Sequence, residues 1–530
     1  MLIPKGNMEK RRIALIRQFL ITKQLLRSDN HSQLSLAPIT TLPTRFPKRL
    51  FLDGESATPI FHKLIDSMTT DIEGLLKMYS KIRDDDEFVN AFCCIVEKVY
   101  LSGKKSVSNC IRAYVTRNDF LLDQSSGELK MAQVEINLSS VVGPHSMEEL
   151  TELHKMLVIP EYRSKLPGNK PRTLLIDNLR TLDDVYKARF GDGQRQCILW
   201  VLGKFEANFP EILHCVSCLR DVVRASELGR DGERSDSSGR VETEGGGENI
   251  SSRTTVETAA VEGNNTRVFV VAWDDLANAL SNLKFENQRF YFNPALFVYN
   301  EEDYLFEVST VYFRTGYRPD HYHTQNHWLL REFIEASECA VIPSAVSQLV
   351  GLKKAQQVWS SKQTFVGAEN ERPALERYLP NKQQRDHITN MFVDQVDVSD
   401  EDPHTLRIIQ DALKNPQHYV LKPQREGGGN NIYGDQIPLA LPPLLENKTA
   451  SHILMTKIDS PETLTEIYVD DVLSIKSCVS EIGFYGVGIW NGNKQVVNEN
   501  IGYLLRTKKA DSDEGGISIK AAVFDSVMLV

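Results

Sequence analysis

The sequence predicts an α/β protein, and two observations support this prediction. Short apolar runs typical of buried strands, among them RTLLIDN (172–178), CILWVL (197–202), RVFVVAW (267–273) and TVYFR (310–314), alternate with segments of helical periodicity. The 530 residues are 41% hydrophobic and 25% charged, which is enough to bury a sizeable core and favours more than one domain.

Composition and charge exclude several classes of protein. The formal net charge of -10 and the lack of a Lys/Arg stripe argue against nucleic-acid binding. No apolar run is long enough to span a membrane, and charged residues interrupt the apolar N-terminal segment, so we expect an amphipathic helix there rather than a signal peptide. The eight cysteines are scattered along the chain, which favours reduced thiols in a cytoplasmic protein.

Local patterns predict the remaining elements in order. LAPITTLPTRFP (36–47) indicates an extended crossing, and helical patterns follow to about Val99, with the acidic run at 84–87 interpreted as a solvated helix start rather than a metal site. Residues 226–266 contain no aromatic residue and are rich in Gly, Ser, Glu and Thr, so we expect a disordered acidic insertion in a surface loop. Beyond Val350 a helix starts at KKAQQ, and three strand patterns follow: HYVLK (418–422), HILMTKI (452–458) and SEIGFYGVGIW (480–490).

The stretch VLKPQREGGGNNIYG (420–434) predicts a polyphosphate site. Its strand delivers Lys422 at the end, and Gly427, Gly428 and Gly429 let backbone N–H groups approach a polyanion closely. Glu426 suits a hard cation such as Mg²⁺, which binds carboxylates together with phosphate oxygens. A flexible turn is the alternative for three glycines alone, but the flanking Lys, Arg, Glu and Asn residues favour a triphosphate.

Two further strands place polar residues on one face. In QVEINLSS, Glu135 and Asn137 are two residues apart, and with Glu426 they could supply oxygens to a metal ion on the phosphates; a solvent-facing edge is the alternative. LLRTKK places Arg506 and Lys508 in the same way, although a lone basic strand face is more often solvated.

Three other motifs remain open at this point. Arg314 directly follows an apolar strand, an arrangement common in carboxylate recognition. The histidines at 321, 323 and 327 raise the possibility of zinc, but their spacing matches neither a zincin helix nor a zinc finger. HCVSC (214–218) holds a single C-x-x-C, which favours structural thiols on a helix.

Together these stretches resemble the eukaryotic-type glutathione synthetases. The resemblance covers nearly the whole chain apart from the insertion, and it rests on KPQREGGGNN, EIN, YFR-x-GY, ILM-x-KI and LLRTK in the same order. It implies an ATP-grasp fold with an inserted α/β substrate-binding domain and a lid that carries the glycine-rich loop. The implied parts are an N-terminal part of the catalytic domain (1–192), the inserted domain (193–345) and a C-terminal ATP-grasp part with the lid (346–530).

The resemblance also implies roles for individual positions. Those that match nucleotide-binding residues are Lys353, Lys422, Gln424, Gly427, Gly428, Gly429, Asn430, Asn431, Tyr433, Met455, Lys457, Ile458, Glu481 and Lys508. Those that match peptide- and glycine-binding residues are Arg117, Ser139, Ser140, Glu206, Asn208, Arg314, Tyr317, Arg506, Ile517 and Ser518. Arg117, Arg506, Gly427, Gly428 and Glu514 are implied as catalytic, and Glu135, Asn137 and Glu426 as ligands of two Mg²⁺ ions.

The implied activity is an ATP-dependent ligation of glycine to γ-glutamylcysteine through an acyl phosphate, carried out by a homodimer with no nucleic-acid or membrane partner. Where family members have a longer segment after EIN, this chain has 138–141, one residue short, so either Ser139 or Ser140 could contact the peptide. Ile517 and Ser518 replace two smaller residues, which keeps β-alanine open as an acceptor. A non-catalytic ATP-binding protein and a zinc-binding interaction protein are the alternatives from other classes.

Overall fold

A computed structural model describes residues 5–28, 33–191, 195–204, 206–228, 267–297, 304–361, 373–425, 429–512 and 522–530. Helices and strands alternate along most of the chain, which confirms the predicted α/β class. The insertion predicted at 226–266 lies outside the described residues except for its first three, which end a helix.

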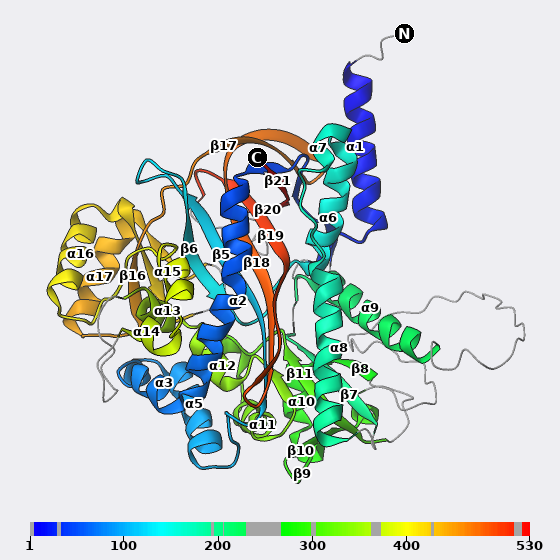
Figure 1. The fold of residues 1–530 in the computed structure, drawn as a ribbon, viewed down its shortest axis with the longest axis vertical. Coiled ribbons are helices and arrows are strands. Elements are labelled where there is room, and N and C mark those ends of the chain that lie inside the picture. Colours follow the sequence, from blue (N-terminus) through cyan, green and yellow to red (C-terminus); the bar gives the residue numbers. More distant parts are fainter. Residues whose placement is uncertain are drawn as a thin grey trace, which may run out of the picture.

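The largest sheet joins segments from both ends of the chain. Its seven strands are arranged in the order β17-β3-β20-β19-β18-β5-β6, so strands near the N-terminus pair with strands near the C-terminus (Figure 1). The strands are β3 (Ile39–Thr40), β5 (Ile111–Asp123), β6 (Lys130–Asn137), β17 (Thr463–Val469), β18 (Val472–Asn491), β19 (Lys494–Lys509) and β20 (Ala522–Asp525). Strands β5, β18 and β19 are long, and together they form the centre of the molecule.

One face of this sheet is covered by the long helix α2 (Lys48–Thr70), which lies across it in Figure 1. Phe51 and Phe61 of α2 make edge-on ring contacts with Phe484 of β18 and Phe120 of β5, at centroid distances of 5.4 and 6.5 Å. Because side chains alternate along a strand, the neighbours of these phenylalanines point to the opposite face. The apolar half of each strand therefore packs on α2, and the polar half is left for the other side of the sheet.

The second sheet contains three of the strands that the apolar runs predicted, β7, β8 and β11. Its order is β8-β7-β11-β10-β9, with β12 paired to β11, and β8, β7, β11 and β12 run parallel. The strands are β7 (Gln196–Leu202), β8 (Arg267–Ala272), β9 (Lys284–Glu286), β10 (Arg289–Phe292), β11 (Phe306–Phe313) and β12 (Ala340–Ile342). Both β7 and β11 are buried along their whole length, as expected for parallel strands covered on two faces.

One strand prediction was wrong. RTLLIDN lies in helix α8 (Pro171–Phe190), which starts with a proline in its first turn. The buried positions Leu175, Leu179, Leu182 and Tyr186 follow helical spacing over about three turns, whereas the seven-residue window contains too little of this period to reveal it. The HCVSC motif does lie on a helix, α9 (Phe209–Leu228), as predicted.

The third sheet is small and has its own hydrophobic core. Its order is β13-β16-β14-β15, and it packs on two helices. The elements are β13 (Gln395–Asp397), β14 (Tyr419–Pro423), β15 (Ile432–Tyr433), β16 (His452–Thr456), α16 (Pro403–Lys414) and α17 (Ile437–Glu446). Tyr419, Leu421 and Leu454 face this core, so the alternating residues Lys422 and Met455 face the other way.

The acidic run at 84–87 ends helix α4 (Ile82–Asp85) and starts helix α5 (Glu87–Val96). Asp84, Asp85 and Glu87 are exposed, as predicted for a solvated helix start, and only Asp86 departs from the prediction. Asp86 is buried and accepts hydrogen bonds from the N–H groups of Phe88 and Val89, which makes it the helix N-cap. The same carboxylate forms an ion pair with Arg425, which follows β14. The run therefore also connects the N-terminal helices to the third sheet.

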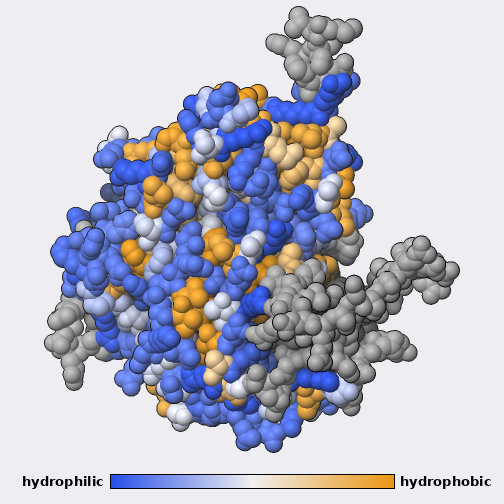
Figure 2. Space-filling model, turned by 45° about the vertical axis from the view of Figure 1, so that its right-hand side comes forward, coloured by the Kyte–Doolittle hydropathy of each residue, from blue (hydrophilic) through white to orange (hydrophobic). Residues whose placement is uncertain are grey.

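The surface is mainly hydrophilic. Figure 2 shows separate hydrophobic patches, with one gathered beside the N-terminal helix α1 (Lys5–Thr22) near the top of the view. In α1, Leu15 and Ile21 are among the exposed large hydrophobic residues. Among the residues that the structure describes, no helix has the length and apolar character needed to cross a membrane.

Candidate active site

A cavity of about 610 Å³ lies between the seven-stranded sheet and the third sheet. It opens on the polar face of β5, β6, β18 and β19, opposite α2. The predicted site residues that line it are Arg117, Glu135, Asn137, Ser139, Ser140, Glu206, Asn208, Tyr317, Lys353, Lys422, Asn431, Tyr433, Met455, Lys457, Ile458, Glu481, Arg506 and Lys508. Residues from widely separated parts of the sequence therefore meet in one cavity.

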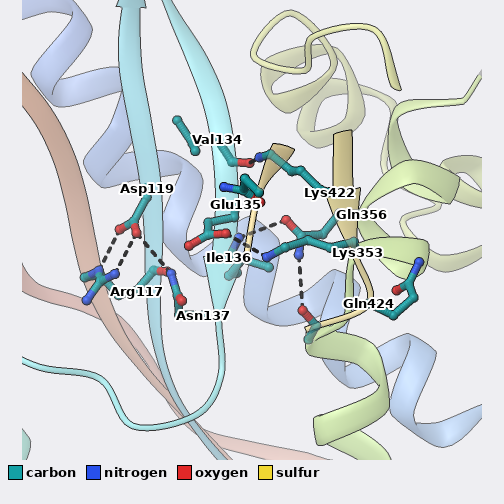
Figure 3. A network of polar contacts seen from close by, with 12 residues as sticks. Arg117, Asp119, Val134, Glu135, Ile136, Asn137, Lys353, Gln356, Lys422 and Gln424 are labelled. Atoms are coloured by element: carbon teal, nitrogen blue, oxygen red, sulfur yellow. Dashed lines mark hydrogen bonds and ion pairs between the residues drawn. The ribbon is translucent and has the colours of Figure 1, made fainter. Parts of the chain in front are cut away.

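Strand register sets the geometry of the cavity floor. Arg117 of β5 pairs with Asn137 of β6, and Asp119 pairs with Glu135, so all four side chains emerge on one face of two neighbouring strands (Figure 3). Arg117 donates to both carboxylate oxygens of Asp119, with both nitrogen–oxygen distances at 2.7 Å. This buried partner raises the pKa of the Arg117 guanidinium against the opposing effect of burial, so the arginine stays charged.

A second arginine completes the floor. Arg506 of β19 pairs with Glu481 of β18, and its guanidinium bonds to the Glu481 carboxylate and to Asp119, which lies 3.1 Å away. Burial raises the pKa of Glu481, and this pKa stays raised although the neighbouring Arg506 lowers it. The hydrogen bonds between the two side chains fix their relative positions. The floor thus carries two fixed arginines within one hydrogen-bonded network.

Two lysines meet at Glu135 from the opposite wall. Lys353, at the start of helix α13 (Lys353–Ser360), places its Nζ 2.6 Å from Oε2 of Glu135. Lys422 of β14 donates to the backbone oxygen of Val134 at 3.0 Å (Figure 3). Burial favours the neutral acid, but the two ammonium groups outweigh it and hold the pKa of Glu135 well below its usual range.

The electrostatic state of Lys422 follows from the same cluster. Burial lowers the pKa of Lys422 to about 8, Glu135 counteracts this, and Lys353 adds to it. Two cations beside one carboxylate leave a positive excess. Such a site attracts a polyanion, because each phosphate oxygen relieves the repulsion between the lysines.

Two glutamines hold the lysine-bearing segments against the sheet. The side-chain oxygen of Gln356 accepts the N–H of Ile136 at 3.0 Å, which satisfies a backbone donor of the edge strand β6. Gln424 is buried and accepts the N–H of Lys354 at 3.0 Å rather than lining the cavity. Both bonds fix the start of α13, and therefore the direction of Lys353.

At the other end of the cavity the two candidate serines differ. Ser139 is buried, and its hydroxyl donates to the side chain of Gln348 at 2.9 Å. Ser140 has a left-handed backbone with φ +49°, which is uncommon for a residue other than glycine. Its side chain lies close to Tyr317, whose pKa is raised mainly by burial. The side chain of Ser140, but not that of Ser139, is therefore directed toward another residue of the cavity wall.

Arg314 does not line the cavity. It is buried behind the wall and donates to the backbone oxygen of Val141, which lies in the segment that carries the two serines. Its neighbour Glu211 accepts hydrogen bonds from the N–H of Gly143 and the hydroxyl of Ser146. Burial raises the pKa of Glu211 to about 7, so this second layer supports the loop with a carboxyl group that is partly protonated near neutrality.

Of the three histidines considered for zinc, His323 and His327 share a partner, since their Nε2 atoms lie 3.9 and 3.0 Å from Oδ1 of Asp274 and their ring centroids are 5.7 Å apart. His321 accepts the N–H of Gly316, and His327 caps its own helix and contacts Asp274. In the part of the chain that the structure describes, no three His, Cys, Asp or Glu residues form a cluster suited to a metal ion.

Several predicted residues cannot be placed in this geometry. Glu426, Gly427, Gly428, Glu514, Ile517 and Ser518 lie outside the described residues. Gly429 has φ +88°, a left-handed conformation that glycine adopts without strain, and neither it nor Asn430 lines the cavity.

One central residue was missed from the sequence. Asp119 bonds to both arginines, yet it was not among the candidate residues. The signal was present, because Asp119 lies two positions after Arg117 and therefore on the same face of β5.

Comparison with known proteins finds matches along nearly the whole chain. Residues 10–529 match the family model described as "Eukaryotic glutathione synthase, ATP binding domain". The chloroplastic glutathione synthetase of Solanum lycopersicum is 29% identical over 502 residues, covering 93% of this chain and 78% of the relative. The glutathione synthetase of Homo sapiens is 26% identical over 505 residues, covering 93% and 90%.

A solved structure shows the same fold. A glutathione synthetase-like effector from Globodera pallida, in its apo form, superimposes with a TM-score of 0.67 at 14% identity, covering 100% of this chain and 98% of that one. This likeness, together with the three sheets, agrees with the expected ATP-grasp architecture.

Proposed function

This chain belongs to the eukaryotic glutathione synthase family, and from that premise we propose that it joins glycine to γ-glutamylcysteine at the expense of ATP. The carboxylate of the peptide attacks the γ-phosphate, and the amine of glycine then attacks the acyl phosphate, which yields glutathione, ADP and phosphate. The observation that supports this most directly is the cavity in which two lysines, two oxygen donors and two arginines converge.

The lysine end of the cavity suits the triphosphate. Phosphoryl transfer depends mainly on positioning and charge neutralisation, and Lys353 and Lys422 provide both from one wall. Glu135 and Asn137 offer a carboxylate and an amide oxygen, a donor set that fits Mg²⁺, since this ion completes its shell with phosphate oxygens and water. When bound, Mg²⁺ would neutralise charge on the phosphates. We expect two ions, with Glu426 as a third protein ligand.

The arginine end suits the peptide and the reacting carboxylate. Arg117 and Arg506 are held by buried acids, so they are preorganised rather than free to rotate. Guanidinium groups fixed in this way can bind a carboxylate and stabilise the oxyanion that develops on it. Ser140 is our candidate for the peptide contact, because the hydroxyl of Ser139 is engaged by Gln348.

The third sheet would act as the lid. Its cavity-facing residues Lys422 and Met455 cover the nucleotide end, while its own core keeps it a separate unit that can move as a body. We propose that the glycine-rich segment at 427–429 closes with it and excludes water from the acyl phosphate.

We further propose a cytoplasmic homodimer. All eight cysteines are free, which supports a reducing compartment. Exposed apolar residues near α1, including Leu15 and Ile21, offer a surface that a second copy could cover (Figure 2). Light scattering after size exclusion would give twice the chain mass of 60.0 kDa for the dimer and the single mass if the proposal is wrong.

The test of the activity uses the purified protein with ATP, Mg²⁺ and γ-glutamylcysteine. Phosphate release and product mass are measured with glycine, β-alanine or serine as the acceptor. Turnover mainly with glycine supports the proposal, and preference for another acceptor assigns the protein to that ligation instead. Nucleotide binding without any product would overturn the ligase proposal. Arg506→Ala should lower turnover by about 100-fold or more, as for loss of an oxyanion donor.

A further inference from the structure

We infer that Asp119 is a positioning residue that orients three site residues at once. Its side chain is fully buried on strand β5, between β18 and the edge strand β6. The carboxylate accepts two hydrogen bonds from Arg117 at 2.7 Å and one from Asn137 at 3.0 Å (Figure 3). It accepts a further one from Arg506 at 3.1 Å. One carboxylate thus connects strands β5, β6 and β19. The inference rests on the proposed function, since it assigns a purpose to these three contacts.

The contact with Asn137 fixes the direction of its amide. An ionised carboxylate only accepts hydrogen bonds, so the amide group turned toward Asp119 must be the NH₂. Asn137 lines the cavity, and its oxygen is therefore the atom left for a ligand. An amide oxygen is a suitable ligand for a hard cation, whereas an NH₂ group is not. Asp119 consequently selects the orientation in which Asn137 can bind Mg²⁺.

The two arginines are held for a different ligand. Asp119 takes two of the five N–H groups of Arg117 in a side-on pair, which leaves the rest of the planar group for the peptide. Arg506 is shared between Asp119 and Glu481, so its plane is fixed from two sides. Loss of the Asp119 carboxylate would therefore release both arginines and turn Asn137 together.

The neighbouring strand leaves space for this arrangement. Gly483 of β18 pairs with Asp119, and a Cβ on this glycine would lie 2.3 Å from Oδ1 of Asp119. This added Cβ would also lie 2.8 Å from Cγ of Arg117. Any larger residue at this position would therefore collide with the ion pair. A glycine at this place in a long central strand, where its flexibility lowers strand stability, is explained by the room that the pair needs.

Asp119→Asn is the variant that tests the inference, because it keeps the size and removes the charge. Its NH₂ group would face a donor, so Asn137 should turn its oxygen inward, away from the cavity. We expect the Mg²⁺ concentration that half-saturates binding of a non-hydrolysable ATP analogue to rise by about 10-fold or more, the typical effect of losing an outer-shell partner. Calorimetry should also show weaker binding of γ-glutamylcysteine, while analogue binding without Mg²⁺ stays unchanged.

A double-mutant comparison separates positioning from general damage. In an Asn137→Ala background, Asp119→Asn should leave the Mg²⁺ requirement where Asn137→Ala alone puts it, because the residue through which Asp119 acts is gone. An additional 10-fold shift in that background would overturn the inference, and so would the absence of a shift in the single variant.

The matched control is Asp66→Asn. Asp66 forms the same two-bond pair with Arg112, also on β5, at 2.8 and 3.1 Å, and neither residue lines the cavity. This control should lose stability without a change in the Mg²⁺ requirement; an equal change in both variants would overturn the inference. Asp119→Ser, which leaves room for water, serves if Asp119→Asn does not fold. If neither Asp119 variant folds while Asp66→Asn does, Asp119 serves stability alone, and this result would also overturn the inference.

These outcomes are distinct from those of the activity test. The inference is measured by nucleotide and peptide binding, so it can fail in a protein that makes glutathione. Conversely, a protein that makes no glutathione can still show the Mg²⁺ shift, and a wild-type protein whose analogue binding is independent of Mg²⁺ would overturn the inference directly.

Discussion

Gly483→Ala should destabilise the protein and weaken peptide binding, although it adds a single methyl group. The new Cβ would lie 2.3 Å from Oδ1 of Asp119, whereas real Cβ atoms essentially never approach closer than 3.0 Å, so the oxygen must move by about 0.7 Å, the difference between these values. Starting from 2.7 Å, the bond from Nε of Arg117 would then exceed the normal range for a hydrogen bond.

The expected size of the effect follows from these contacts. Loss of a buried hydrogen bond between charged groups costs about 2 kcal/mol, and forcing a methyl group into a packed strand costs about 2 kcal/mol more. We therefore expect urea denaturation, followed by circular dichroism, to give a free energy of unfolding lower by about 4 kcal/mol. The dissociation constant for γ-glutamylcysteine should rise at the same time, since Arg117 loses its fixed orientation.

Gly168→Ala provides the control for this experiment. No atom outside the adjacent residues lies within 4 Å of a Cβ built on Gly168, so its stability should change by less than about 1 kcal/mol. If Gly483→Ala behaves like Gly168→Ala in both stability and peptide affinity, the ion pair has free space that the structure does not show, and the reasoning about Asp119 fails with it.

Three further predictions concern other parts of the molecule. Lys353→Met should weaken ATP binding by about 10-fold or more in calorimetry, because Glu135 loses its cation. The control is Lys354→Met, since the ammonium group of Lys354 pairs with a carboxylate outside the cavity, and this variant should bind ATP normally. Equal losses of affinity in the two variants would contradict the assignment. Burial lowers the pKa of His62 to about 4, so this histidine is neutral when folded, and the stability it contributes is present above pH 6.5 and lost as the pH falls to about 4. This pKa difference corresponds to about 3 kcal/mol of unfolding free energy. His62→Gln should therefore flatten a plot of unfolding free energy against pH between 6.5 and 4, and an unchanged curve would refute the prediction. Asp86→Ala removes both the N-cap of α5 and the partner of Arg425, and should lower the unfolding free energy by about 3 kcal/mol in urea titrations; a loss below about 1 kcal/mol would show that the cap alone matters.

Most of the strands predicted from local sequence patterns are strands in the structure, but the patterns could not predict how they pair. CILWVL and RVFVVAW are short and apolar because parallel strands are buried on both faces, and they lie in the second sheet as β7 and β8. RTLLIDN also contains a short apolar run but belongs to a helix, which the wider spacing from Leu175 to Tyr186 reveals. The pairing of β5 with β18 joins segments hundreds of residues apart, and no local signal encodes it.

In the candidate site, too, local motifs reveal some residues, whereas the role of others depends on how the strands pair. Residues in recognisable motifs, such as Glu135 and Lys422, were predicted as candidates and do line the cavity. Asp119 and Gly483 were not, because their importance depends on which strand lies next to which. Arg314 was predicted from its place after a strand, but the sequence could not reveal that the wall formed by the 138–142 segment would stand between it and the cavity.

The pairing of distant strands has a consequence for synthesis of the chain. Asp119 and Arg506 are separated by 387 positions, so β5 and β6 leave the ribosome long before the strands that complete the cavity floor. At translation rates of roughly 5 to 20 residues per second, this interval lasts on the order of 20 to 80 s. During that time the long edge of β5 that will pair with β18 has no partner, and a buried acid and arginine are exposed in a half-built sheet. The nascent chain therefore passes through a prolonged stage in which an open strand edge can pair with another chain, and we expect shielding by chaperones at this stage to limit its yield in cells.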